Sequence, residues 1–414
     1  MNQLDRARSM CGSLQGRGGR RLTAPLIVAG CAIVALGCGD DRSPSGPDVT
    51  PVLASTSATP LDFRQIVSGT NHSCGLTLGS RIFCWGLNDH GQLGDGTRGD
   101  RSRPVPVATG LRFLQLSAGN YHTCAIARDN RAYCWGSNFE GGLGDGTTTD
   151  RLTPVAVRGG HLFRQIGAGD GHTCGATTVD QGYCWGSNIL GQLGDGTTIR
   201  RLRPVAVATT RKLRQVSAGA VHTCGMTPSG IALCWGHNAE GQLGSGATAP
   251  RRTPRVVVGE LRFRQLGVSY VQNCGVTFAN LAYCWGNNSN GQLGDGTTTN
   301  RLAPVRVAGG LQFSRVSPGG VHSCGVTTAG AAYCWGYNFY GEVGDGTTTR
   351  RLRPVAVSGG LTFSAVSSSF GSFHTCGVTT GSSAYCWGYN FYGQLGDGTS
   401  SETNPTPVAV IGPM

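Results

Sequence analysis

Apolar and polar residues alternate in short runs along most of the chain, and each run is bounded by glycine or proline. The stretch from Phe313 to Val357 contains, in order, the runs FSRVS, HSCGVT, AAYCWG and PVAV. Runs of about five residues with this alternation are typical of β-strands. No stretch between Asp62 and Val410 has the periodicity of a helix, so the pattern predicts an all-β protein built from four-stranded units.

The four-stranded unit repeats seven times. Its Cys-Trp-Gly motif recurs at a spacing of 50 residues five times and then 52, and it begins at Cys84, Cys134, Cys184, Cys234, Cys284, Cys334 and Cys386. A fixed period of this size is typical of solenoids and propellers. One such unit has two open edges and too small a core to be stable alone, whereas units arranged radially cover each other's faces. We therefore predict a seven-bladed β-propeller of four-stranded antiparallel blades over residues 61–410, closed between FRQIV at Phe63 and PVAV at Pro407, with a tail at 411–414.

The N-terminal segment has a different character. Five arginines precede an apolar run from Ala24 to Gly37, which is too short to span a bilayer as a helix. This combination predicts an export signal over residues 1–37. The ALGC sequence ending at Cys38 resembles a bacterial lipobox and predicts lipidation there; the alternatives are VAGC ending at Cys31, an ordinary secretory signal, or an uncleaved anchor. Residues 38–60 are rich in Ser, Thr, Pro and Asp and are predicted to be a flexible tether. We expect an exported protein, membrane-anchored at the cell envelope or extracellular.

The repeat region contains fourteen cysteines in seven pairs, and the two members of each pair flank one turn. The pairs are Cys74 and Cys84, Cys124 and Cys134, Cys174 and Cys184, Cys224 and Cys234, Cys274 and Cys284, Cys324 and Cys334, and Cys376 and Cys386. The spacing predicts a hairpin with a three-residue loop whose third residue is left-handed, and Gly, Asn or Asp occupies that position in five of the seven units. The cysteines then face each other at a non-hydrogen-bonded position. In an exported protein this arrangement predicts seven disulfides.

Zinc is the alternative to a disulfide. His322, Cys324 and Cys334 would supply three ligands of the kinds that zinc binds. In the fifth unit, however, Gln272 replaces the histidine and both cysteines remain. The cysteines therefore do not depend on a histidine, and we predict no metal.

The charge of the chain is strongly positive. The chain has 34 basic and 22 acidic residues; residues 1–37 hold five of the former and one of the latter, which leaves a net charge of +8. Such a surface permits an acidic partner, including anionic polysaccharide or lipid headgroups, and does not require nucleic acid. We expect no nucleic-acid partner.

The repeated sequence, with its consensus GxxHtCgvT, yCWGxNxxGQLGDGT and RxxPVxV, resembles the repeat of the regulator of chromosome condensation family. The resemblance covers Phe63 to Val410 and implies a seven-bladed propeller. The founder of that family is a guanine-nucleotide exchange factor for a nuclear GTPase and also binds chromatin; relatives include cytoskeletal and light-signalling proteins and a secreted bacterial β-lactamase inhibitor. Two features oppose exchange activity here: the export signal, and repeats too uniform to contain the β-wedge that the founder inserts into its GTPase.

Several repeated polar residues are predicted to be structural. The spacing of Asn88 and Asp95 in NxxGQLGDGT is similar to that of a calcium loop, but each unit offers one carboxylate and the fourth has Ser245 in its place. A structural turn is the better interpretation. The repeated histidines suggest a hydrogen bond that each blade needs, although they could also ring a central channel. The arginine clusters at 200–203, 251–255 and 350–353 would form a discontinuous basic rim or simply a solvated one.

The positions that break the repeat are the candidate site. Around the asparagine after Cys-Trp-Gly, the sixth and seventh units turn aromatic; the candidate binding residues are Tyr337, Phe339, Tyr340, Tyr389, Phe391 and Tyr392, with Phe370 and Phe373 from the irregular loop of the seventh unit. The other five units have one aromatic residue at these positions, Phe139. Packing between blades is one interpretation, and an exposed binding patch is the other.

The sequence contains no catalytic constellation and no phosphate-binding or metal motif, so we expect no catalytic residue and no cofactor. Two functional hypotheses remain. One is a monomeric, surface-tethered module that binds a protein or polysaccharide partner. The other is a hydrolase or lyase whose site is spread across blades. We favour the binding module, because a flat aromatic patch suits recognition and a pocket with shifted titratable groups would be needed for catalysis.

Overall fold

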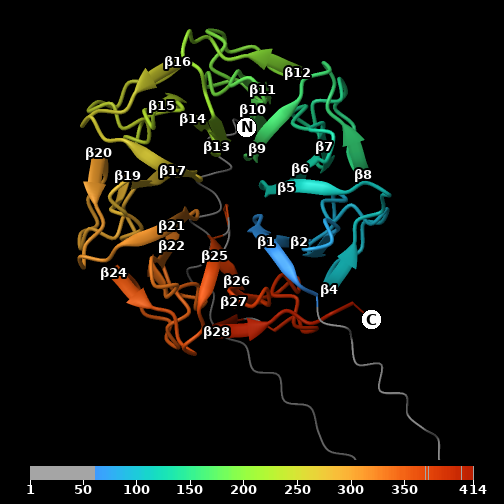
Figure 1. Ribbon diagram of the computed structural model, residues 1–414, viewed down its shortest axis with the longest axis vertical. Coiled ribbons are helices and arrows are strands. Elements are labelled where there is room, and N and C mark those ends of the chain that lie inside the picture. Colours follow the sequence, from blue (N-terminus) through green and yellow to red (C-terminus); the bar gives the residue numbers. More distant parts are fainter. Residues whose placement is uncertain (1–60, 369, 372, 402, 414) are drawn as a thin grey trace, which may run out of the picture. The chain divides into compact units, whose positions relative to one another are not determined.

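The computed structural model describes residues 61–368, 370–371, 373–401 and 403–413, and forms seven sheets around a common axis (Figure 1). The predicted export signal, Cys38 with its alternative Cys31, and the predicted tether lie outside these residues. Each sheet contains four strands in sequence order, all antiparallel to their neighbours. The prediction of an all-β propeller with seven four-stranded blades is therefore confirmed.

The strands have the same bounds in nearly every blade. The innermost strands are β1 (Phe63–Ser68), β5 (Phe113–Ala118), β9 (Phe163–Ala168), β13 (Gln215–Ala218), β17 (Phe263–Val268), β21 (Phe313–Pro318) and β25 (Phe363–Ser368). The second strands are β2 (His72–Thr77), β6 (His122–Ala127), β10 (His172–Thr177), β14 (His222–Met226), β18 (Gln272–Thr277), β22 (His322–Thr327) and β26 (His374–Thr379). The third strands are β3 (Ile82–Gly86), β7 (Ala132–Gly136), β11 (Gly182–Gly186), β15 (Ala232–Gly236), β19 (Ala282–Gly286), β23 (Ala332–Gly336) and β27 (Ala384–Tyr389). The outer strands are β4 (Arg101–Pro106), β8 (Arg151–Ala156), β12 (Arg201–Ala206), β16 (Arg251–Val256), β20 (Arg301–Arg306), β24 (Arg351–Ala356) and β28 (Thr403–Ala409).

The hydrophobic core lies between blades rather than inside any one of them. A representative cluster joins Cys74 and Leu76 of the first blade to Phe113 and Trp135 of the second. All seven tryptophans are fully buried in such interfaces. Because each blade completes its core with its neighbour, the repeat is stable only as a closed set.

The ring closes between the first and the seventh blades. The amide of Ser68 donates to the hydroxyl of Ser367 at 3.0 Å, and the amide of Phe63 donates to the carbonyl oxygen of Ser382 at 2.8 Å. Phe63 and Trp85 share a core with Cys376 and Leu395. In Figure 1 the blue strand β1 lies beside the red blade that ends at β28. The predicted closure is confirmed.

The hairpins between second and third strands have the predicted form. In every blade the two cysteines pair directly and form a disulfide with Cα atoms 4.0–4.1 Å apart. The third loop residue has positive φ in all seven units, with values of 61–84°. The two units whose sequences did not favour this conformation, at Ser80 and Ser382, adopt it as well, because the register of the flanking strands fixes the loop.

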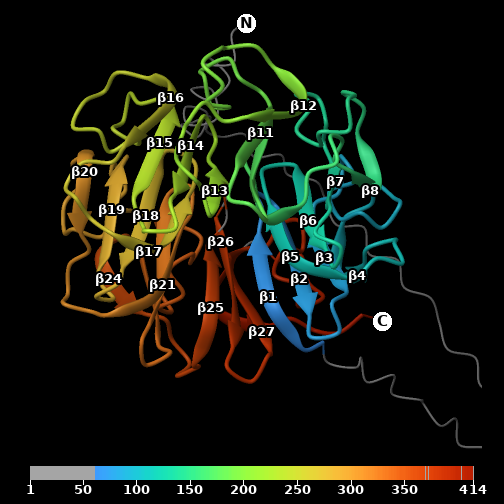
Figure 2. The ribbon, with the colours of Figure 1, turned by 45° about the horizontal axis from the view of Figure 1, so that its top comes forward.

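The outer strands begin earlier than the sequence suggested. The prediction placed them at the PVxV runs, whereas β4 begins at Arg101, which pairs with Gly86 across the blade. A bulge between Cys84 and Gly86 takes up the extra residues. Figure 2 shows the strands of neighbouring blades standing side by side, so that the loops gather at their two ends. Among the residues described, no helix is long and apolar enough to cross a membrane.

Candidate functional site

The repeated histidines link neighbouring blades. The Nε2 atom of His72 lies 2.9 Å from Thr123 Oγ1 in the second blade, and that of His374 lies 2.9 Å from Ser73 Oγ across the closure. The same contact is made by His122, His172, His222 and His322. In the fifth blade Gln272 replaces the histidine and donates to Ser323 Oγ at 3.2 Å. The prediction of one hydrogen bond per blade is confirmed. Burial lowers the pKa of His72 to about 3, so this ring is neutral at physiological pH.

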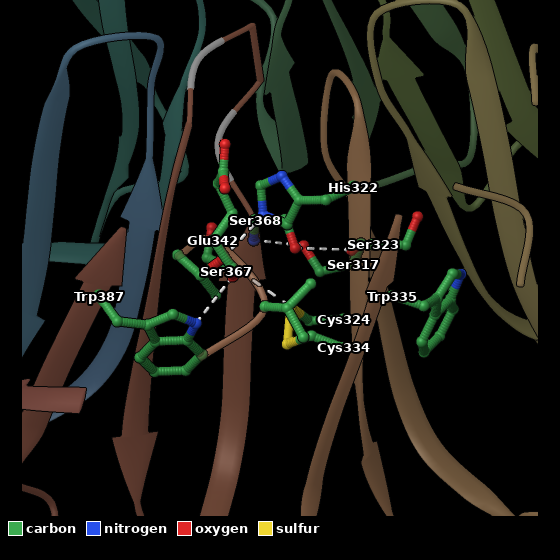
Figure 3. Close-up of a disulfide and its surroundings, with 12 residues drawn as sticks. Ser317, His322, Ser323, Cys324, Cys334, Trp335, Glu342, Ser367, Ser368 and Trp387 are labelled. Atoms are coloured by element: carbon green, nitrogen blue, oxygen red, sulfur yellow. Dashed lines mark hydrogen bonds between the residues drawn. A yellow bond between two sulfur atoms is a disulfide. The ribbon is translucent and has the colours of Figure 1, made fainter. Parts of the chain in front are cut away.

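A loop carbonyl of each blade receives two further bonds from the next blade. The Trp387 indole donates to the carbonyl oxygen of Glu342 at 2.8 Å (Figure 3). The Thr375 hydroxyl donates to the same oxygen at 3.0 Å. The equivalent tryptophan bonds recur around the ring. Two residues later Gly344 lies so close to Trp387 that a Cβ atom would approach the indole to 2.7 Å. The Trp-Gly part of the motif in one blade therefore packs against the glycine-rich part in the preceding blade.

The asparagine–aspartate loop is a structural turn. Asn88 Nδ2 donates to Asp95 Oδ1 and to two loop carbonyls, and Asn88 Oδ1 accepts from the amide of Leu93. The second aspartate oxygen pairs with Arg101 at 2.9 Å. Burial alone would raise the pKa of Asp95, but hydrogen bonds from Thr97 and Arg101 outweigh it and hold that pKa below its usual value. The side-chain oxygens are thus occupied by the loop itself, as the turn interpretation predicts. Within the described ranges no group of three or more His, Cys, Asp or Glu side chains is arranged to hold a metal ion.

The aromatic residues of the sixth and seventh blades form one continuous cluster of rings. Tyr340 links the two blades, because its ring centroid lies 4.9 Å from that of Tyr389 and 5.1 Å from that of Phe373. Tyr337 also contacts Phe373, at 5.5 Å. We call the seven residues the aromatic cluster; they are Tyr337, Phe339, Tyr340, Phe373, Tyr389, Phe391 and Tyr392.

The cluster lies on the surface and is not an interior contact between blades. Phe339 and Phe391 are 64% and 57% exposed, while the four tyrosines and Phe373 are partly buried beneath and between them. Phe339 packs on Tyr337 and Tyr340, Phe391 packs on Tyr389 and Tyr392, and Tyr340 contacts Tyr389 between the two blades. Truncating the outer rings therefore removes surface and leaves the packed layer in place.

Phe370 does not belong to this cluster, contrary to the expectation from the sequence. It is 6% exposed, and its ring lies 6.4 Å from Tyr270 of the fifth blade. It also lines the central channel, a cavity of about 290 Å³ bounded by the innermost strands. The irregular loop of the seventh blade thus directs Phe370 toward the axis and Phe373 toward the cluster. Among the described residues that line the channel, one is charged, Arg315.

Glu342 is a feature of the site that sequence reasoning missed. It is fully buried and stands where other blades have a glutamine, as at Gln92, Gln292 and Gln394. It lies two residues after the cluster residue Tyr340, whose amide donates to Glu342 Oε2 at 3.0 Å. Its Oε1 atom has no hydrogen-bond partner. Burial raises the pKa of this carboxyl to about 8. The signal was present in the sequence, since GEVGDGT replaces GQLGDGT in the sixth unit alone.

The repeats match two models of the regulator of chromosome condensation (RCC1) repeat. One matches residues 80–126, 129–176, 181–226, 280–326, 329–378 and 383–414, which together exceed half of the chain, and the second matches five further stretches from residue 63 to 394. The chain belongs to the RCC1 repeat family.

Three solved structures have the same fold. Human WBSCR16 matches with a TM-score of 0.72 and 20% identity, covering 80% of this chain and 93% of that one. Prp20p from Saccharomyces cerevisiae matches with a TM-score of 0.71 and 22% identity, covering 84% and 87%. Yeast RCC1 (Prp20) in a complex with Kap60 matches with a TM-score of 0.70 and 20% identity, covering 89% and 91%. No curated protein sequence matches. At these identities the likeness shows the fold alone.

Proposed function

We propose that this RCC1-repeat propeller is an exported binding module that engages a protein partner through the aromatic cluster. The observation that carries the proposal is the pair of exposed phenylalanines, Phe339 and Phe391, held outward by a layer of tyrosines. Large exposed aromatic side chains are enriched at the centres of protein interfaces, and an apolar patch without a partner is an aggregation hazard.

Its relatives are consistent with a protein partner. The yeast protein Prp20p is described with binding properties toward Gsp1p and histones, and yeast RCC1 (Prp20) is described bound to Kap60. Exchange activity on a nuclear GTPase is a poorer hypothesis for this chain, because each of the seven sheets described has four strands and the loops of the first six units keep one length. A polysaccharide partner would stack on the same rings and is distinguished by the test below.

Seven buried disulfides support a location outside the cytosol, where thiols are kept reduced. We extend this to export by the signal at residues 1–37 and anchoring by a lipid on Cys38. Replacing Cys38 by Ala should release the protein from the membrane fraction or block its processing. Release on Cys31→Ala alone would move the anchor to that residue, and retention of both variants would remove it from the proposal.

The aromatic cluster is tested by truncating its two exposed rings. The Phe339→Ala/Phe391→Ala variant should lose partner binding by roughly thirtyfold or more, since truncation of an anchoring aromatic often costs about 2 kcal/mol. Binding is measured by capture from an envelope extract of the source cell, followed by titration of the captured partner. Phe139→Ala is the matched control, because it removes a 70% exposed ring at the equivalent position of the second blade.

Equal binding by the parent and the double variant would contradict the proposed site. Equal losses in the double variant and in Phe139→Ala would show that binding is not specific to the aromatic cluster and would contradict it as well. Capture of a polysaccharide, abolished by the same double variant, would keep the site and change the class of partner.

A further inference from the structure

The propeller end opposite the aromatic cluster carries a separate concentration of charge. We call it the hairpin face; it consists of the seven hairpin loops between second and third strands and of the segments equivalent to residues 260–264, which lead into the innermost strands and begin them. The amide of Phe113 donates to Ser80 O of the preceding hairpin, and Phe163 donates likewise to Asn130 O. The same bond recurs around the ring, so loops and segments alternate at one end of the strands. The aromatic cluster lies at the other end, because Tyr337 follows the last residue of β23 whereas the hairpin precedes its first.

The hairpin face is strongly basic. Its basic residues are Arg64, Arg81, Arg112, Arg128, Arg131, Arg164, Arg211, Lys212, Arg214, Arg262 and Arg264. Its acidic residues are Asp62, Asp129, Asp180 and Glu260. The hairpin face therefore carries eleven cations and four carboxylates, and nine of the eleven cations are exposed. Two of the eleven are paired within the face, Arg131 with Asp129 at 3.7 Å and Arg164 with Asp180 at 2.8 Å, which leaves nine cations and two carboxylates.

Exposed apolar side chains lie among these cations. Leu78, Val179 and Phe278 are 58%, 63% and 61% exposed at the hairpin loops of the first, third and fifth blades. Leu114 and Leu162 add two more at 44% each. All seven hairpins have the same loop length and register, so their tips end at one level. The result is a face with apolar tips and a surrounding field of positive charge.

We propose that the hairpin face docks on the surface of an anionic lipid bilayer. Cations near an anionic leaflet and apolar side chains buried at the headgroup boundary both favour membrane binding, and their contributions add. A polysaccharide or nucleic acid would neutralise the arginines but would gain nothing from Leu78, Val179 and Phe278. The described chain begins on this face, at Leu61, just before β1.

The test is sedimentation of the full chain with phosphatidylcholine vesicles that do or do not contain phosphatidylglycerol. Every variant keeps the same first 60 residues, so differences between variants report the propeller. Neutralising four exposed cations by Arg112→Gln, Arg211→Gln, Lys212→Gln and Arg262→Gln should weaken binding to the anionic vesicles by roughly five-hundredfold, at about fivefold for each charge. The matched control is Arg252→Gln, Arg255→Gln, Arg350→Gln and Arg353→Gln, which removes the same charge from the exposed outer edge of the blades and should leave binding within about threefold.

A second variant separates a bilayer from other polyanions. Leu78→Ser, Val179→Ser and Phe278→Ser together should weaken vesicle binding by about tenfold or more while leaving binding to a sulfated polysaccharide unchanged. The unchanged protein should also detach from the anionic vesicles as salt is raised. Equal losses in the face and edge charge variants, unchanged vesicle binding by the face charge variant, or full vesicle binding by the apolar variant would each overturn the proposal.

Discussion

Protein that is denatured and fully reduced is expected not to regain the propeller when denaturant is removed under reducing conditions. Each disulfide closes a loop of about ten residues, for which the loop-entropy argument gives roughly 3 kcal/mol of stabilisation. Seven of them would contribute about 20 kcal/mol, which exceeds the 5–15 kcal/mol of net stability of a typical folded protein. Refolding of the oxidised and the reduced chains is followed by far-ultraviolet circular dichroism and by urea titration of the product.

A single-blade variant checks the size of each contribution. Cys274→Ala/Cys284→Ala removes one disulfide from the fifth blade, where Gln272 already replaces the histidine. The free energy of unfolding should fall by about 3 kcal/mol while the other six blades keep their disulfides. Native-like spectra and an unchanged urea midpoint in the reduced chain would contradict this view of the stability.

The second large effect concerns Glu342, whose replacement by Gln should stabilise the protein at neutral and alkaline pH. Its carboxyl stays protonated in the folded state up to about pH 8, whereas in the unfolded chain it ionises near its usual pKa of 4.5. Between these two values this carboxyl binds more protons in the folded than in the unfolded state, so its contribution to the free energy of unfolding falls as pH rises. At pH 7 the buried carboxyl of Glu342 lowers the free energy of unfolding by about 3 kcal/mol, and this loss disappears below the unfolded pKa.

The measurement is the free energy of unfolding from urea titrations at pH 4, 6 and 8. The stability of Glu342→Gln relative to the parent should grow from near zero at pH 4 to at least about 3 kcal/mol at pH 8, because the neutral buried histidines contribute equally to both proteins. The variant places at this position the residue that Gln394 supplies in the seventh blade. Glu260→Gln, at an exposed position of the hairpin face, is the matched control and should leave the curve of the parent unchanged. An advantage of the variant over the parent that does not grow between pH 4 and 8, or a variant no more stable than the parent at pH 8, would contradict the buried-acid interpretation.

Much of the fold could be predicted because the same pattern of strands and turns occurs seven times in the sequence. The ten-residue spacing of Cys324 and Cys334 determines the hairpin loop and places the sulfurs opposite each other. The repeated histidine indicated a bond in every blade, but its partner lies about 50 residues away and only the packing of blades reveals it. The start of β4 was missed because Arg101 does not look like a strand residue, and its pairing depends on a bulge.

The candidate site was found at positions where the repeat is broken. The prediction was wrong where it depended on the direction or burial of a side chain, which the sequence does not determine. Phe339 and Phe391 were identified because no other blade has aromatic residues at all three of these positions. Phe370 was assigned to the cluster because it lies near Phe373 in the sequence, yet the loop sends the two side chains in different directions. Glu342 was overlooked because a Gln-to-Glu change is small on paper; its importance comes from complete burial, which the sequence does not display.

The two proposed surfaces form a consistent arrangement. The aromatic cluster and the hairpin face lie at opposite ends of the strands, so a propeller docked on a bilayer by its hairpin face would present the cluster away from the membrane. A partner could then be bound without displacing the protein from the lipid. The two surfaces can also be inactivated independently, because they share no residue.

The most direct measurement of the central claim is site-specific photocrosslinking at the aromatic cluster. A photoreactive phenylalanine analogue is placed at Phe391, and in a second protein at Phe139, which is exposed at the equivalent position of the second blade. After irradiation with the captured partner, we expect a covalent adduct from position 391 and none from position 139. An adduct from position 139 alone, or equal adducts from both, would contradict binding at the aromatic cluster.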